Sequence, residues 1–124
     1  MTQRILVVED TEDNRRIIRD LLTARGYDLI EAADGAAGVA MAQQERPDLI
    51  LMDIQLPEID GYEATRRIRA VPELAKVPII AVTSYALSGD EAKTREAGCD
   101  GYVAKPFSPR DLLAKVRQFL PDAE

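Results

Sequence analysis

The sequence predicts an α/β protein of the doubly wound (βα)5 class, in which five β-strands alternate with five α-helices. Short apolar runs recur along the 124 residues, and such runs are typical of strands buried on both faces of a parallel sheet. Segments with apolar residues at helical spacing separate these runs. Because crossovers between parallel strands are right-handed, this alternation places helices on both faces of the sheet.

The expected strands follow the apolar runs in chain order. They are Ile5–Val8, Tyr27–Ala32, Leu49–Met52, Val77–Val82 and Tyr102–Ala104. The second run mixes apolar and charged residues, which is typical of an edge strand, whereas the others are continuous. The common order for five such strands is 2-1-3-4-5, and this order predicts a flavodoxin-like three-layer sandwich.

Two of the expected helices have clear apolar faces. The faces are Ile17, Ile18, Leu21 and Leu22 in the first helix, and Leu112, Leu113, Val116, Phe119 and Leu120 in the last. The pairs Arg15-Arg16 and Arg66-Arg67 lie on different expected helices, and we interpret both as solvated surface.

End signals support the same helices. Gly26 and Gly98 fit C-terminal caps. Ser88 stands three residues before a Glu, which is the spacing of a capping box at the start of the fourth helix. Ser108 precedes Pro109, and this pair is typical of the first residues of a helix.

Composition limits the class of protein. With 46% hydrophobic and 31% charged residues, the chain is an ordinary globular sequence, and its length suits a single domain over residues 1–124. No apolar run approaches the ~20 residues of a membrane span, and the N-terminus lacks the features of a signal peptide. One Cys forms no internal disulfide, so we expect a cytoplasmic protein without a membrane partner.

Charge and residue types limit the chemistry. The formal net charge of −6 argues against nucleic acid as a partner. The sequence contains no His, which excludes Ser-His-Asp and Cys-His nucleophiles and imidazole acid–base catalysis. Any reaction must therefore use carboxylates, hydroxyls and lysines.

Polar residues follow four of the five expected strands, at the point where each strand ends. They are Glu9-Asp10, Asp53, Thr83-Ser84 and Lys105-Pro106, after the first, third, fourth and fifth strands. Because ligands bind outside the carboxyl ends of the strands in such sheets, we expect these groups to meet in one pocket.

Three carboxylates in one pocket predict a divalent cation. At an effective dielectric constant near 20, two carboxylates 4 Å apart repel by about 4 kcal/mol, and a hard cation relieves this repulsion. We expect Mg²⁺, with Mn²⁺ as the alternative ion. Asp10 and Asp53 are the expected direct ligands, with Glu9 binding directly or through water and the backbone carbonyl of Gln55 completing the set.

The same pocket is suited to phosphoryl chemistry. A carboxylate can act as a nucleophile and form an acyl phosphate, and phosphoryl transfer mainly requires positioning and charge neutralisation. Asp53 follows the most apolar strand and is the expected nucleophile. Lys105 and Thr83 supply an ammonium and a hydroxyl for the transferred group.

These residues resemble the motif set of receiver domains, the chemotaxis-receiver-like response regulators of two-component signalling. The match covers approximately residues 3 to 120 and consists of Glu9-Asp10, Asp53, Pro57, Gly61, Thr83, Tyr102 and Lys105-Pro106. The chain departs from the family pattern in having Glu9 where Asp is commoner, and Ser84 where a smaller residue is frequent.

The resemblance implies a function. A sensor histidine kinase or a histidine phosphotransfer protein would donate a phosphoryl group to Asp53 with Mg²⁺. Thr83 and Tyr102 would then remodel the face of the fourth helix, fifth strand and fifth helix, which binds a downstream protein. It further implies a cis Lys105–Pro106 peptide, and that Gln55 and Tyr85 tune the lifetime of the phosphorylated state.

The chain is also similar to stand-alone receivers of the alphaproteobacterial cell-cycle type, and we expect no output domain. Two alternatives to the phosphorylated switch remain open. One is a pseudo-receiver that binds partners without phosphorylation. The other is a Mg²⁺-dependent phosphohydrolase with an aspartyl-phosphate intermediate, although Asp53 is followed by Ile-Gln instead of the second acid that such enzymes carry two residues on. On the main interpretation the protein is not a metabolic enzyme.

Overall fold

The computed structural model describes residues 3–84 and 90–120. Its elements, in chain order, are β1 (Arg4–Val8), α1 (Glu12–Thr23), β2 (Asp28–Ala32), α2 (Gly35–Glu45), β3 (Leu49–Asp53), α3 (Gly61–Arg69), a short 3₁₀ turn (Pro72–Leu74), β4 (Ile79–Thr83), α4 (Asp90–Ala97), β5 (Gly101–Ala104) and α5 (Pro109–Phe119). Tyr85 and the expected cap Ser88 lie outside the described residues.

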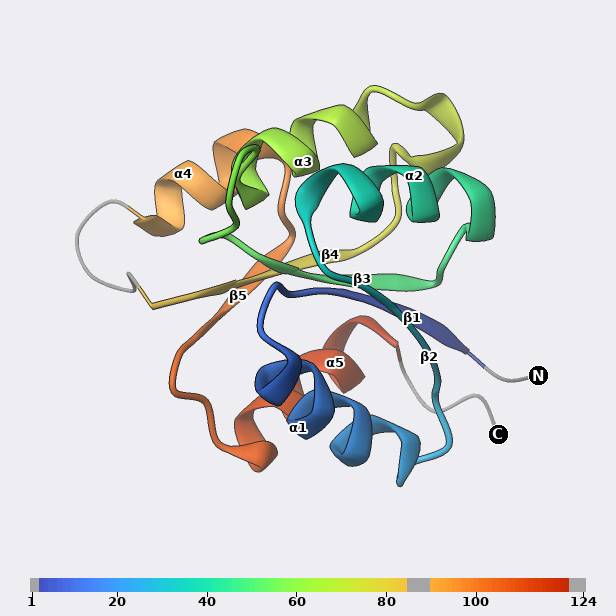
Figure 1. Cartoon of the computed structure of the whole chain (residues 1–124), viewed down its shortest axis with the longest axis vertical. Helices are drawn as coiled ribbons and strands as arrows, with labels where there is room; N and C mark the ends of the chain where they lie inside the picture. The colour runs from blue at the N-terminus through green and yellow to red at the C-terminus, as the bar shows by residue number, and fades with distance from the viewer. Residues whose placement is uncertain (1–2, 85–89, 121–124) are drawn as a thin grey trace.

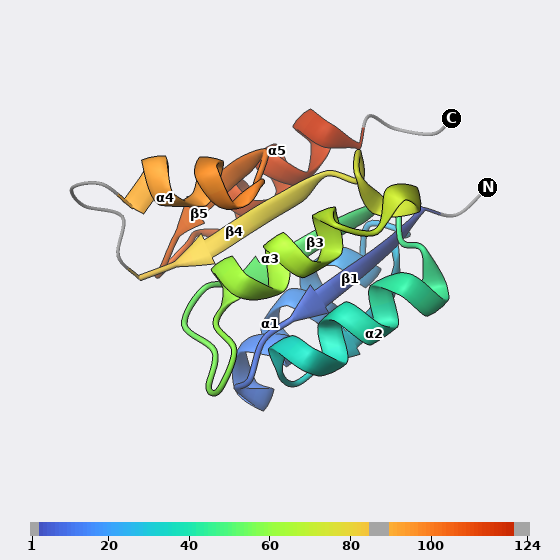
Figure 2. The same ribbon diagram turned by 90° about the horizontal axis from the view of Figure 1, so that it is seen from above.

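The strands form one parallel sheet in the order β2-β1-β3-β4-β5, so the predicted doubly wound, flavodoxin-like topology is confirmed. Figure 1 shows the three layers, with α1 and α5 covering one face of the sheet and α2, α3 and α4 covering the other. The view from above in Figure 2 shows the strands lying side by side between these layers. The strand β2 lies at one edge of the sheet, as its mixed composition predicts.

The core has two parts because strand side chains alternate between the faces of the sheet. Leu6, Ile50 and Met52 face the layer of α2, α3 and α4, where they pack with buried residues such as Ile68. Residues one position along in each strand, for example Leu51, pack toward α1 and α5 on the opposite face. All five residues of β3 are buried, so the sheet's central strand brings an acid into the interior at its last position.

Two predictions at the level of elements need correction. The predicted strand 77–82 begins at Ile79 and extends to Thr83, because Pro78 has no N–H for the sheet ladder and the preceding residues form the 3₁₀ turn. Ile17 does not join the buried face of α1: its exposed fraction is 53%, whereas Ile18 and Leu22 are buried. Ile17 instead lines a surface pocket beside Pro106.

The end signals are confirmed where the structure describes them. The Ser108 side chain accepts a hydrogen bond from the backbone N–H of Asp111, 3.0 Å away, with Pro109 as the first residue of α5. Gly26 and Gly98 have φ angles of +90° and +114°, the left-handed conformation that terminates a helix. Within the described ranges, no helix is both long and apolar enough to cross a membrane.

Candidate functional site

Three carboxylates meet at the carboxyl edge of the sheet. Glu9 and Asp10 directly follow β1, and Asp53 is the last residue of the neighbouring strand β3. One carboxylate oxygen from each residue lies within 4.8 Å of the other two. Glu9 and Asp53 are each 2% exposed, and Asp10 is exposed. The three carboxylates therefore meet at one edge of the sheet, as the sequence predicts.

Asp53 is held in place from two sides. Its Oδ1 accepts a hydrogen bond from the backbone N–H of Gln55 at 3.1 Å, and its Oδ2 lies 3.2 Å from the Nζ of Lys105. A buried carboxylate is tolerated only when such partners replace its lost hydration. The strand thus fixes the backbone of Asp53, and these two contacts fix its carboxylate.

The start of α3 presses against the backbone of Asp53. The N–H of Gly61 donates to the carbonyl of Ile54 at 2.9 Å. A Cβ atom at position 61 would overlap the carbonyl oxygen of Asp53 and would lie 2.6 Å from the Cα of Ile54. Only glycine allows this approach, so Gly61 sets the position of the loop that forms one wall of the site.

Glu9 shares Lys105 with Asp53. Its Oε1 lies 3.1 Å from the Lys105 Nζ, and its Oε2 accepts from the backbone N–H of Thr11 at 3.2 Å and from Asn14 at 3.5 Å. The longer side chain of Glu, where the family more often has Asp, therefore reaches the lysine directly. The sequence places both residues at the same edge of the sheet but does not indicate this ion pair, because the choice of partner depends on side-chain directions.

The ammonium of Lys105 lies between the two buried carboxylates. Burial alone would lower its pKa, but the nearby charges of Asp53 and Glu9 outweigh burial and raise the pKa above the ordinary lysine value. Lys105 is therefore charged at neutral pH. Its backbone N–H donates to the Thr83 carbonyl at 2.7 Å, and the Lys105–Pro106 peptide is cis, as the resemblance implies.

The set of donors fits a divalent cation. The three carboxylates and the ammonium together carry a formal charge of −2, which one such ion neutralises. Hard cations prefer carboxylate oxygens, and Asp10, as the exposed member, keeps access to solvent.

Gln55 connects the ends of the two central strands. Its side-chain Oε1 accepts a hydrogen bond from the backbone N–H of Ser84 at 3.0 Å, while its own N–H donates to Asp53. Thr83, the fully buried last residue of β4, lies directly before Ser84. Gln55 thus bridges to the residue that follows Thr83, whose hydroxyl is expected to bind the phosphoryl group.

A pocket of about 580 Å³ opens beside the carboxylates. It is lined by Asp10, Ile54, Gln55, Leu56, Pro57, Asp60, Tyr62 and Lys93. Pro57 belongs to the receiver motif set and lies in this lining, but Asp60, Tyr62 and Lys93 were not predicted. Asp60 directly precedes α3, and Tyr62 and Lys93 lie on α3 and α4. Their sequence spacing alone does not indicate which side of a helix faces the pocket.

Tyr102 lies on the edge strand β5, next to β4, and does not line the pocket beside the carboxylates. It is half-buried on β5, packs against the core, and pairs in register with Ala81, whereas Ala104 pairs with Thr83. Together with Lys115 it lines a separate pocket of about 410 Å³ between β5 and α5.

The interpretation of Arg15 as solvated surface is wrong. Its side chain is only 16% exposed, and its Nη1 donates to the backbone carbonyl of Glu9 at 2.7 Å. Arg16, Arg66 and Arg67 are 58%, 56% and 51% exposed, so the interpretation holds for them. The missed signal is that Arg15 follows Glu9 by six residues, a spacing that lets the first turns of α1 reach back to the acidic pair.

Comparison with known proteins gives a consistent result. The family model for the response regulator receiver domain matches residues 5–117. The polar-differentiation response regulators DivK of Brucella ovis and of Brucella abortus are each 42% identical over 123 residues, which is 99% of this chain and 100% of theirs.

Solved structures agree with the sequence relatives. The chemotaxis protein CheY4 of Vibrio cholerae superposes with a TM-score of 0.92 at 28% identity, covering 96% of this chain and 99% of that one. The receiver domain of the sensor histidine kinase PA1611 of Pseudomonas aeruginosa is 42% identical, with a TM-score of 0.90 over 98% of this chain and 100% of that one. That structure has a magnesium ion coordinated in its active-site cleft.

The family match, the DivK relatives and the shared fold all cover nearly the whole chain. These proteins are signalling components of two-component systems, not metabolic enzymes, and the predicted similarity to alphaproteobacterial cell-cycle receivers is confirmed. The chain belongs to the response regulator receiver domain family.

Proposed function

We propose that the protein accepts a phosphoryl group on Asp53 and uses it to switch its contacts with other proteins. One observation carries this proposal: the buried carboxylate of Asp53 ends the central strand beside Glu9 and Asp10, with the Lys105 ammonium 3.2 Å away. A carboxylate in this position is a nucleophile whose product, an acyl phosphate, forms next to a fixed positive charge.

The expected donor is the phosphohistidine of a sensor histidine kinase or of a histidine phosphotransfer protein. The donor lies on a separate protein, because this chain contains no His. A carboxylate oxygen of Asp53 attacks phosphorus, an O–P bond forms, and the N–P bond breaks. The imidazole leaves with the electron pair of that bond. Lys105 then balances charge on the transferred oxygens, and the Thr83 hydroxyl binds one of them.

Asp10, Asp53 and the backbone carbonyl of Gln55 would hold Mg²⁺, or Mn²⁺ in its place, with Glu9 contributing directly or through water. The donor set of the cluster supports this assignment. When bound, the ion neutralises negative charge on the phosphoryl oxygens. The chain's own part is to place the carboxylates within 4.8 Å of one another and to keep the nucleophile buried.

The output would be a change on the face of α4, β5 and α5. Thr83 and Tyr102 lie on the paired strands β4 and β5. Movement of the Thr83 hydroxyl toward a phosphoryl group would be accompanied by an inward turn of the Tyr102 ring, as the receiver family implies. Phosphorylation acts on this equilibrium only through the contacts that differ between the two states. Tyr85, outside the described residues, and Gln55 would set how long the phosphorylated state lasts.

Intact-mass spectrometry tests the proposal. The protein is incubated with acetyl phosphate and Mg²⁺, and one phosphoryl group is expected to add. Asp53→Asn should add none. Asp60→Asn is the matched control, because Asp60 also lines the pocket but caps α3 through its oxygen, which Asn can replace. This variant should be phosphorylated like the parent.

Other outcomes would favour the alternatives. No mass gain in the parent, either with acetyl phosphate or with a cognate kinase, would contradict the proposal and indicate a pseudo-receiver. Continuous hydrolysis of varied phosphate esters, with turnover abolished in Asp53→Asn, would instead indicate a phosphohydrolase.

A further inference from the structure

We infer that Arg15 is a positioning residue for the metal site: it fixes the backbone of the Glu9–Asp10 turn so that both carboxylates face Asp53. The inference rests on the proposed function, because it assumes that the acidic cluster binds a divalent cation. Arg15 itself touches no reacting atom in this account and acts only through Glu9.

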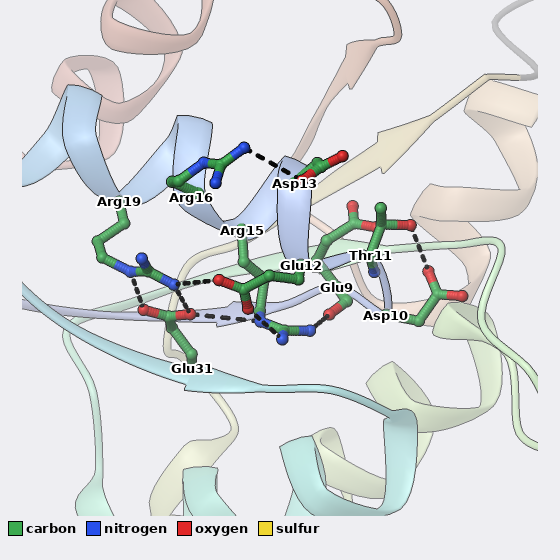
Figure 3. Close-up of polar contacts among 9 residues, drawn as sticks. All are labelled: Glu9, Asp10, Thr11, Glu12, Asp13, Arg15, Arg16, Arg19 and Glu31. Carbon is green, nitrogen blue, oxygen red and sulfur yellow. Dashed lines mark hydrogen bonds and ion pairs between the residues drawn. The ribbon is translucent and has the colours of Figure 1, made fainter.

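All of the guanidinium nitrogens of Arg15 are engaged. Nη1 donates to the Glu9 carbonyl at 2.7 Å, Nη2 lies 2.6 Å from Glu12, and Nε lies 3.3 Å from Glu31. Figure 3 shows the guanidinium between the turn that carries Glu9, the first turn of α1 and the strand β2. Because the guanidinium is planar and its donors point in fixed directions, its position also fixes the direction of the carbonyl that it binds.

The backbone of Glu9 is held from both sides. Its N–H donates to the carbonyl of Ala32 in β2 at 3.0 Å, and its carbonyl accepts from Arg15. These two bonds fix the peptide planes before and after the Cα of Glu9. Because the next peptide leads directly into Asp10, the bond from Arg15 also determines how Asp10 enters the pocket.

The side-chain contacts of Glu9 alone do not give this control. Its Oε2 is bound by Thr11 and Asn14 at 3.2 and 3.5 Å, which are contacts within the same turn and helix start. These contacts move with the turn, and the pair between Oε1 and the Lys105 Nζ at 3.1 Å holds the carboxylate but not the carbonyl. Arg15 binds the Glu9 carbonyl and, through Glu31, ties it to β2.

Arg19 provides a matched control on the same helix. It pairs with the same two acids, with Nε 2.5 Å and Nη2 2.8 Å from Glu31 oxygens and Nη2 3.4 Å from Glu12. Figure 3 shows Arg19 on the far side of Glu31, where it makes no marked contact with Glu9. Removing either arginine deletes one positive charge near the site, but only removal of Arg15 releases the Glu9 carbonyl.

The test measures Mg²⁺ affinity of the unphosphorylated protein by isothermal titration calorimetry. Arg15→Ala should raise the Mg²⁺ dissociation constant by about 10-fold or more, the loss typical for residues that orient metal ligands. Arg19→Ala should leave it close to that of the parent. The midpoint temperature of thermal unfolding without Mg²⁺ should be lower than that of the parent in both variants, because both lose ion pairs to Glu12 and Glu31.

Conservative variants keep the test valid if Arg15→Ala does not fold. Lys keeps the charge but cannot hold the carbonyl and two carboxylates at once. Arg15→Lys should therefore bind Mg²⁺ more weakly than Arg19→Lys. In NMR spectra of the backbone amides, the signals of Glu9 and Asp10 should change position in the Arg15 variants and stay unchanged in the Arg19 variants.

The results separate this inference from the proposed function. If the parent binds Mg²⁺ and the Arg15 and Arg19 variants bind it equally well, Arg15 has no positioning role and the proposed function stands. Equal weakening in both variants would also overturn the inference, since loss of charge would then explain the effect. If the parent binds no Mg²⁺, both are wrong.

Discussion

At the scale of residues, Lys105 determines whether two buried carboxylates can coexist. Its Nζ lies 3.1 Å from Glu9 and 3.2 Å from Asp53, and both acids are 2% exposed. Their charges raise the pKa of Lys105 in spite of its burial, so the ammonium is present throughout the neutral range. The site is therefore built from mutually dependent charges, and removing one of them affects the others.

Replacing Lys105 with Met should destabilise the protein by about 2 kcal/mol at neutral pH, because it leaves two buried carboxylates without their cation. Mg²⁺ should recover part of this loss, since the ion supplies the missing positive charge. Urea unfolding of parent and variant, with and without Mg²⁺, measures both effects. A loss of stability that Mg²⁺ does not reduce would contradict the account of the charge cluster.

Gly61 is the residue at which the start of α3 meets the backbone of Asp53. Gly61→Ala should destabilise the protein by about 2–3 kcal/mol, because the added methyl overlaps the carbonyl of Asp53. Gly26→Ala is the control: Gly26 has open space around it, so only its positive φ opposes the change, at about 1 kcal/mol. Equal losses in urea unfolding would show that the contact with Asp53 is unimportant.

At the scale of elements, capping side chains fix the starts of α2, α3 and α5. Asp60 caps α3 by accepting a hydrogen bond from the backbone N–H of Glu63 at 2.9 Å. It also lines the same pocket as Asp10. Its position could suggest a fourth metal ligand. The cap provides a sufficient structural reason for an acid at this position.

Asp60→Ala should therefore lower the free energy of unfolding by about 1 kcal/mol, as expected for loss of an N-cap. Asp60→Asn, which keeps an acceptor oxygen, should be nearly neutral. Neither variant should change the Mg²⁺ dissociation constant by an order of magnitude. A large loss of Mg²⁺ affinity in both, measured by calorimetry, would instead make Asp60 part of the metal site.

At the scale of the whole molecule, an ion-pair network joins α1 to the edge strand β2 (Figure 3). The hydrogen bond from Arg19 holds the pKa of Glu31 below its ordinary value, and those from Arg15 and Arg19 do the same for Glu12. A carboxyl group with a lowered folded-state pKa stabilises the fold above its unfolded pKa, and this contribution is lost as the pH falls through the folded value.

Arg19→Gln should therefore reduce stability most at neutral pH, with the full difference from the parent present above about pH 4.5, the ordinary value for Glu. The difference should shrink at lower pH as Glu31 becomes protonated in the folded state. Urea unfolding from pH 3 to pH 7 measures this. A difference that stays constant over the whole range would mean that the charge of Glu31 does not contribute.

Much of the fold and of the site follows from the sequence, for a physical reason. Buried parallel strands appear as apolar runs, and the residue after each run lies at the carboxyl edge, so Glu9, Asp53, Thr83 and Lys105 could be placed together from their positions alone. Local signals such as Ser108 before Pro109 act within one turn and could also be interpreted directly.

What the sequence did not reveal depends on the direction of side chains around helices. Ile17 has the right spacing for the buried face of α1 but lies at its solvent side, and Arg15 looks like a solvated charge but reaches back to Glu9. Lys93 reaches the pocket only because α4 packs beside it. Such contacts depend on how helices are rotated on the sheet, which apolar spacing specifies only to within a residue.

The most direct test of the central claim is to locate the phosphoryl group chemically. The protein is treated with acetyl phosphate and Mg²⁺, reduced with borohydride, which converts an aspartyl phosphate to homoserine, and digested for peptide sequencing by mass spectrometry. Homoserine is expected at position 53, dependent on Mg²⁺ and absent in Asp53→Asn. Conversion at position 10 or 60 instead, or no conversion in a folded parent protein, would contradict the claim.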